Sequence, residues 1–149
     1  MSASASKDHP ELHARIEASF VRQGMMQHLG ARLVSVAPGE VELALPYSER
    51  VTQQQGGYHG GAMGALADIA AGYAGLTMAA PGQEVATVEY KINFLAAFQG
   101  GELRARGHVV RAGKRLIITT AEVVHLDDDG GESPCALMQQ TLAVVKQTY

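Results

Sequence analysis

The chain has 149 residues, of which 46% are hydrophobic and 18% are charged, and its formal net charge is -3 at pH 7. These values predict a packed globular domain and exclude a disordered chain, while the acidic balance argues against nucleic acid as the main partner. The single cysteine, Cys135, can form neither an internal disulfide nor a multi-cysteine metal site, so we expect a reducing, cytoplasmic compartment.

The N-terminal residues 1–8 are polar and lack the apolar stretch of a signal peptide, so they are predicted to form a flexible tail. One amphipathic helix is predicted from His9 to His28, because apolar residues recur at four-residue spacing (Leu12, Ile16 and Phe20). Asp8 is the expected N-cap, Pro10 suits the first turn, and Gly30 is expected to end this region.

Two short strands are predicted next, over 31–37 and 40–45, and a loop without periodicity follows. A long apolar helix is expected from His59 to Ala80, where Pro81 and Gly82 end it. This helix carries Asp68 near its middle, which favours a buried core helix over a membrane span. The rest of the chain predicts four strands joined as an antiparallel meander, over 85–98, 102–111, 114–126 and 136–146.

The order of these elements predicts an α+β architecture, in which a curved antiparallel sheet wraps one long central helix. No internal repeat and no linker divides the chain, so residues 9–149 are expected to form a single domain.

The clearest chemical pattern is His59-Gly60-Gly61 at the start of the long helix, followed by Asp68. Glycines at a helix start leave backbone N–H groups accessible, and these suit an anion or a carbonyl oxygen that gains charge. A carboxylate on an apolar helix is costly unless it is paired, so Asp68 is either a structural cap or a functional group. Taken alone, His59 fits an ordinary loop histidine before a helix better than a functional residue.

Gly60 and Asp68 are eight residues apart, which corresponds to ~12 Å along a helix axis. A carbonyl and the group that attacks it must lie within ~3.5 Å of each other. One helix therefore cannot supply both parts of one site, and we expect an obligate homodimer with two shared sites.

The pattern of His59-Gly60-Gly61, Leu66, Asp68, Thr87 and Gly113-Lys114 resembles the phenylacetic-acid-degradation type (PaaI-like) hotdog-fold acyl-CoA thioesterases. The resemblance implies the hotdog fold, paired subunits and often a homotetramer. It also implies that Gly60 N–H polarises the thioester carbonyl, and that Asp68 of the facing subunit acts as general base or nucleophile. Thr87 would hold the water, and His59 would order the loop.

One residue departs from this family, because Gln53 stands where the family usually has Asn. Gln keeps the amide but is one methylene longer, so it can still donate to the thioester oxygen with altered geometry. In the family the segment Arg111, Gly113, Lys114 and Arg115 lies against coenzyme A, and three cations on a turn suit a nucleotide phosphate. The acyl pocket is expected near Tyr58, Met63 and Phe94, although each also fits a core position.

The sequence is compatible with three functions. The first is hydrolysis of an acyl-CoA thioester without a metal or other cofactor, coenzyme A being part of the substrate. The second is a non-catalytic acyl-CoA binding module, which the Gln53 departure favours. The third is a hydratase or dehydratase that pairs His59 with Asp68 as acid and base. No DNA-binding or membrane segment is expected.

Overall fold

The computed structural model describes residues 9–149, so the predicted tail over 1–8 and the predicted N-cap Asp8 lie outside the described residues. The prediction of one helix from His9 to His28 is wrong, because the chain forms α1 (Pro10–Phe20) and then α2 (Gly24–Leu29). The turn between them redirects the chain, so that Ile16, Phe20 and Met26 all reach the core. Pro10 at the first turn of α1 and left-handed Gly30 at the end of α2 are confirmed.

A single six-stranded antiparallel sheet forms the second layer, with the strand order β1-β2-β4-β5-β6-β3. Its strands are β1 (Arg32–Ala37), β2 (Glu40–Pro46), β3 (Gln83–Phe94), β4 (Glu102–Ala112), β5 (Leu116–Leu126) and β6 (Glu132–Lys146). A single turn of 3-10 helix, η1 (Glu49–Val51), follows β2.

The predicted four-strand meander is correct for β4, β5 and β6 and wrong for β3. Strand β3 pairs with β6 at the far edge of the sheet, and β4 pairs with β2. Segment 95–101 makes this change of position: Leu95 N–H donates to the Cys135 carbonyl at 2.7 Å, and the Phe98 carbonyl accepts from Tyr58 N–H at 2.9 Å. The connection is a crossover rather than the short hairpin that Gly100-Gly101 suggested.

The long helix α3 (Gly60–Leu76) is shorter than predicted. Thr77 caps its C-terminus: the Thr77 hydroxyl donates to the Ala74 carbonyl at 2.6 Å and accepts from Gly39 N–H at 2.8 Å. Pro81 and Gly82 therefore follow the end of the helix and do not cause it. The helix approaches the sheet most closely at Gly107, where an added Cβ would lie 2.4 Å from the Ala70 carbonyl oxygen.

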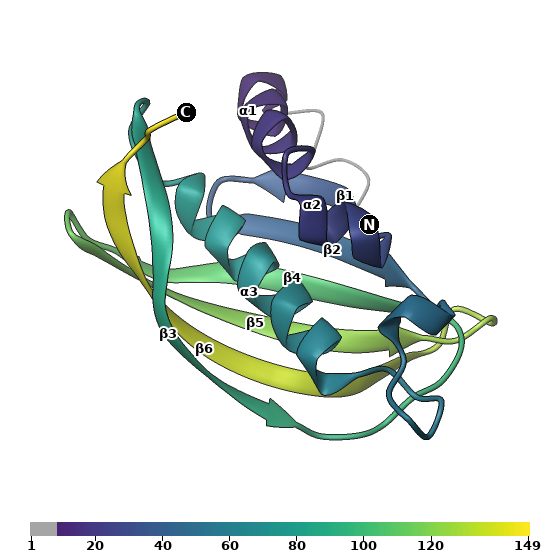
Figure 1. Cartoon of the computed structure of the whole chain (residues 1–149). Coiled ribbons are helices and arrows are strands. Elements are labelled where there is room, and N and C mark those ends of the chain that lie inside the picture. The colour runs from purple at the N-terminus through teal and green to yellow at the C-terminus, as the bar shows by residue number, and fades with distance from the viewer. Residues whose placement is uncertain (1–8) are drawn as a thin grey trace.

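Figure 1 shows α3 crossing the concave face of the curved sheet, with α1 and α2 beside it near β1 and β2. The core lies between α3 and the sheet and includes Leu43, Leu66 and Leu103, all fully buried. The predicted α+β arrangement, a long helix wrapped by an antiparallel sheet, is confirmed. Among residues 9–149, no helix combines the length and apolarity needed to cross a bilayer.

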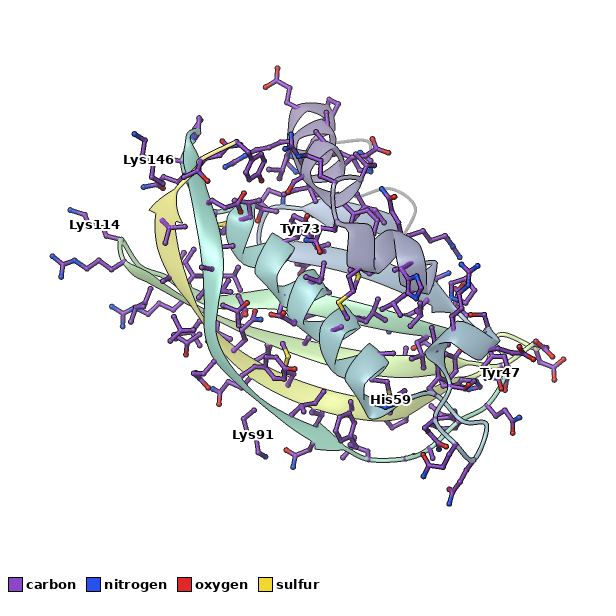
Figure 2. The ribbon with its side chains drawn as sticks, in the orientation of Figure 1. Tyr47, His59, Tyr73, Lys91, Lys114 and Lys146 are labelled. Carbon is purple, nitrogen blue, oxygen red and sulfur yellow. The ribbon has the colours of Figure 1, made fainter. Side chains whose placement is uncertain are left out.

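Three of the labelled side chains show how far apart the two ends of the molecule lie. In Figure 2, His59 lies at the start of α3, whereas Lys114 extends from the opposite end of the molecule at the β4–β5 hairpin. Tyr73 lies between these two regions, on the part of α3 that faces α1.

Candidate functional site

The Asp68 carboxylate is held by two side chains from neighbouring strands. Thr87 Oγ1 in β3 donates to Asp68 Oδ1 at 2.7 Å, and Gln140 Nε2 in β6 donates to the same oxygen. Within residues 9–149, no group donates a hydrogen bond to Asp68 Oδ2. The structure therefore brings Thr87 and Asp68 together, and one carboxylate oxygen remains available for a ligand or water.

Gln140 was not identified from the sequence. It is fully buried, and Thr119 Oγ1 donates to its Oε1 at 2.9 Å, which directs its amide nitrogen toward Asp68. The sequence did carry a signal, because strand alternation places Gln140 on the same face as the buried residues Met138 and Leu142. A polar side chain on an apolar strand face needs a partner.

The start of α3 has one free backbone donor. His59 is the N-cap residue, and its Nδ1 accepts from Gly61 N–H at 2.7 Å. Within residues 9–149 no acceptor lies within hydrogen-bond reach of Gly60 N–H, which is the first N–H of the helix. His59 therefore satisfies one N–H and leaves its neighbour for a ligand. The exposed ring of Phe94 lies against Gly60, where an added Cβ would approach it to 3.2 Å.

The other predicted site residues lie in three different places. Gln53 holds its own loop, since its side-chain oxygen accepts from Gln55 N–H and its backbone N–H donates to the Gly57 carbonyl at 2.9 Å. Tyr58 and Met63 are buried in the core of the chain. The predicted coenzyme A residues are all exposed on the β4–β5 hairpin: Arg111, Gly113, Lys114 and Arg115.

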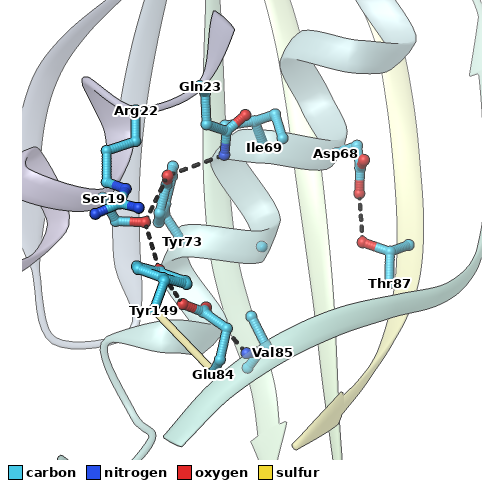
Figure 3. Close-up of a pocket in the computed structure, with 11 residues that line it drawn as sticks. Ser19, Arg22, Gln23, Asp68, Ile69, Tyr73, Glu84, Val85, Thr87 and Tyr149 are labelled. Atoms are coloured by element: carbon cyan, nitrogen blue, oxygen red, sulfur yellow. Dashed lines mark hydrogen bonds between the residues drawn. The ribbon is translucent and has the colours of Figure 1, made fainter. Parts of the chain in front are cut away.

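A cavity of about 390 Å³ opens beside Asp68, between α1, α3 and β3. Figure 3 shows Asp68 and Thr87 on one side of it, and Tyr73 with Ser19, Gln23 and Tyr149 on the other. Burial raises the pKa of Tyr73, while its hydrogen bonds with Ser19 and Gln23 oppose the rise. The Tyr73 hydroxyl therefore stays protonated at neutral pH. No three His, Cys, Asp or Glu side chains gather as a metal site in residues 9–149.

This architecture occurs in known proteins. The sequence model of the Thioesterase superfamily matches residues 55–132, which include Gly60, Asp68 and Thr87. The chain is 28% identical to a 1,4-dihydroxy-2-naphthoyl-CoA hydrolase of Listeria monocytogenes, over 83% of this chain and 98% of that protein.

Two solved structures extend the comparison. A thioesterase family protein from Silicibacter pomeroyi superposes with a TM-score of 0.87 at 37% identity, over 91% of this chain and 99% of that one. A mutant of the phenylacetic acid degradation protein PaaI from Thermus thermophilus superposes with a TM-score of 0.70 at 26% identity, over 80% and 96% of the two chains. The chain therefore belongs to the thioesterase superfamily and has its hotdog fold.

Proposed function

We propose that this protein hydrolyses an acyl-CoA thioester to a free acid and coenzyme A. The observation that carries the proposal is the Asp68 carboxylate, which Thr87 and Gln140 hold through one oxygen at the edge of a cavity. Membership of the thioesterase superfamily supports hydrolysis of a thioester. The Listeria relative, whose name describes a CoA hydrolase, supports coenzyme A as the thiol.

In the proposed reaction, Asp68 either takes a proton from an attacking water or attacks the carbonyl carbon itself. The Thr87 hydroxyl, 2.7 Å from Asp68 Oδ1, lies where it can orient that water. Attack places negative charge on the carbonyl oxygen, which Gly60 N–H stabilises by hydrogen bonding. The carbon–sulfur bond then breaks, and the thiolate of coenzyme A leaves and takes up a proton. If Asp68 attacks first, water hydrolyses the resulting anhydride.

The Gly60 and Asp68 of one site come from two copies of the chain. Within one chain, Gly60 and Asp68 lie eight residues apart on the continuous helix α3, or ~12 Å along its axis. This distance is too long for both to act on the same carbonyl. Strand β3 offers a surface for the second copy, because it is a sheet edge with exposed apolar side chains, among them Val88, Tyr90 and Phe94. An exposed apolar edge strand favours pairing with another strand. We therefore propose a homodimer joined at β3, with homotetramers as a further level of assembly.

The basic hairpin is the proposed binding site for the phosphates of coenzyme A. Arg111, Lys114 and Arg115 are exposed, and within residues 9–149 none of them forms an ion pair with a carboxylate. In one chain this hairpin and His59 lie at opposite ends of the molecule (Figure 2). A second copy can bring the two ends to one substrate. Gln53, His59 and Phe94 are proposed to shape the entrance at the helix start.

The experiment is to measure release of coenzyme A from acyl-CoA by the wild type, Asp68→Asn and Asp68→Ala. Loss of a general base lowers turnover by ~10²–10⁴-fold, and we expect both variants to show it. Asp128→Asn is the matched control, because Asp128 is an exposed carboxylate in the β5–β6 turn. Circular dichroism verifies that each variant is folded. Turnover by Asp68→Ala at the wild-type rate, or tight acyl-CoA binding by the wild type without turnover, would overturn the proposal.

A further inference from the structure

Two buried polar side chains connect the sheet to the Asp68 carboxylate. Thr119 in β5 and Gln140 in β6 are direct cross-strand partners, and both are fully buried on the face of the sheet that α3 covers. Thr119 Oγ1 donates to Gln140 Oε1 at 2.9 Å, and Gln140 Nε2 donates to Asp68 Oδ1. Asp68 lines the cavity, whereas Thr119 and Gln140 do not. The two residues therefore reach the site only through the side chains that line it.

The surroundings of the Gln140 amide fix which of its ends faces Asp68. Three oxygen atoms lie around Nε2: Asp68 Oδ1, the Asp68 carbonyl oxygen at 3.3 Å and Thr87 Oγ1 at 3.3 Å. The Thr87 hydroxyl donates its one proton to Asp68 Oδ1, so all three oxygens accept from Gln140. A reversed amide would place its oxygen against a carboxylate, whereas the Thr119 hydroxyl supplies the proton that Oε1 accepts in the observed orientation. Thr119 thus stabilises the orientation in which Gln140 donates to Asp68.

These contacts restrain the Asp68 side chain in two ways. Gln140 Nε2 contacts the carbonyl oxygen and the carboxylate of the same residue, which fixes the side chain relative to the helix backbone. Thr87 and Gln140 come from different strands and both donate to Oδ1, which opposes rotation of the carboxylate about its Cβ–Cγ bond. Figure 3 shows the Thr87 contact at the edge of the cavity. Oδ2 is then the oxygen that meets a water or a substrate.

This pair of buried polar residues is more than the fold requires. Gln140 lies between the buried residues Met138 and Leu142 on one face of β6, where an apolar side chain would pack without a partner. Burial of two polar side chains costs free energy that their hydrogen bonds offset, so replacing both by apolar groups of the same shape is nearly neutral for stability. In residues 9–149 no buried side-chain nitrogen or oxygen lacks a partner, so the connection to Asp68 is complete. A fully paired polar connection that ends on the candidate catalytic carboxylate fits a role in the reaction.

We propose that Thr119 and Gln140 are positioning residues for the reaction. They hold the Asp68 carboxylate in one orientation, with Oδ2 as the oxygen that takes the proton or attacks the carbonyl carbon. Reacting groups must be held to within ~0.5 Å of the productive geometry, and a displacement of ~1 Å can cost on the order of 100-fold in rate. The inference rests on the proposed hydrolysis at Asp68, and it adds two residues that set the rate without touching the substrate.

The first test separates turnover from substrate binding. We expect Gln140→Leu and Thr119→Val to lower kcat by roughly 10–100-fold with KM nearly unchanged, because neither residue contacts the substrate. Thr119→Ser keeps the hydroxyl and should recover most of that kcat, although it removes the methyl group, which lies 3.7 Å from where a Cβ on Gly75 would stand. A role in packing alone predicts the reverse order, since valine keeps the shape of threonine and serine does not.

The opposite face of the same two strands supplies matched controls. Thr120 and Gln139 are also direct cross-strand partners, but strand alternation places them on the face away from α3. Thr120→Val and Gln139→Leu should therefore keep the wild-type kcat. The double variant Thr119→Val/Gln140→Leu removes both polar partners, so it should fold, and its kcat should equal that of Gln140→Leu. Losses that multiply in the double variant would show that Thr119 does not act through Gln140, and would refute the inference.

A spectroscopic measurement without substrate separates this inference from the proposed reaction. NMR of nitrogen-labelled protein observes the side-chain amide of Gln140, which is assigned by its loss in Gln140→Leu. Thr119→Val should move the amide resonances toward their positions in Asp68→Ala, where the carboxylate is absent, and Thr120→Val should leave them in place. Resonances at their wild-type positions in Thr119→Val, or wild-type kcat in Gln140→Leu, would overturn the inference while hydrolysis stands. If the wild type releases no coenzyme A from any acyl-CoA, the proposed function fails, and the resonances in Thr119→Val still decide whether Thr119 orients Gln140 toward Asp68.

Discussion

The close contact of α3 with the sheet at Gly107 gives a quantitative prediction. A Cβ on Gly107 would lie 2.4 Å from the Ala70 carbonyl oxygen and 2.6 Å from Ala71 N, and both are backbone atoms of a buried helix segment. Ordinary contacts begin near ~3.5 Å, so Gly107→Ala must move helix and strand apart by about 1 Å. Such overpacking lowers the free energy of unfolding by ~1–3 kcal/mol, here at the upper end of that range. Alanine is less flexible than glycine in the unfolded chain, and this offsets ~0.5–1 kcal/mol of the loss.

The net effect of Gly107→Ala is a loss of about 2 kcal/mol in the free energy of unfolding, or roughly 4–8 °C in Tm for a chain of this size. Gly72→Ala is the matched control on α3, because its Cβ meets no atom within 4 Å. It should gain ~1 kcal/mol from helix propensity and raise Tm by roughly 2–4 °C. Thermal unfolding followed by circular dichroism measures both.

The same movement affects the candidate site, since α3 carries both Gly60 and Asp68. A displacement of ~1 Å between reacting groups can cost on the order of 100-fold in rate, and we expect turnover by Gly107→Ala to fall accordingly. If Gly107→Ala melts at or above the wild-type temperature and keeps full turnover, the close packing of helix on sheet does not constrain this site as described.

Three further predictions concern single groups. Gly60→Pro removes the free N–H at the start of α3. Proline is tolerated there because it is the first helical position and the preceding His59 is extended, at φ -68 and ψ 133. Turnover should fall ~10²–10³-fold in Gly60→Pro, while the control Gly60→Ala should retain most of the turnover. Burial raises the pKa of the Glu102 carboxyl, but the hydrogen bonds from Arg104 and Arg32 outweigh burial and lower this pKa below its usual value. Its folded pKa lies below the unfolded one, so urea unfolding should show Glu102→Gln less stable than the wild type at pH 7. The difference should shrink once the pH falls below the unfolded pKa of about 4.3, and it should vanish only below the folded pKa. Burial raises the pKa of the Cys135 thiol to about 11, so a disulfide reagent at neutral pH should label it only after unfolding.

The local patterns of the sequence predicted most of the secondary structure. Apolar spacing and glycine or proline signals indicated the long helix, the strands and the end of the N-terminal helical region at Gly30. The break after Phe20 was missed, although the four-residue repeat of Leu12, Ile16 and Phe20 falls next on Gly24, a residue of low helix propensity. The position of β3 was also missed, since pairing with β6 depends on contacts between distant segments rather than on the adjacent turn.

The candidate site was predictable in its residue types but not in its connections. Asp68 stood out because a carboxylate on an apolar helix needs a partner, and Thr87 entered through the family resemblance. The third member, Gln140, lies 72 residues from Asp68 and becomes its neighbour only through the β3–β6 pairing. The cavity with Tyr73 depends on α1 and Tyr149 meeting across the fold, which no local pattern encodes.

The central claim is that each site combines Asp68 of one copy with Gly60 of another, and mixing two defective chains tests it most directly. Asp68→Ala and Gly60→Pro chains, each inactive alone, are unfolded together, refolded and assayed for coenzyme A release. Random pairing makes half of the dimers mixed, each with one intact site of two, so we predict about a quarter of the wild-type activity. If both groups act within the same chain, no mixed dimer contains an intact site, and the mixture would remain as inactive as its components.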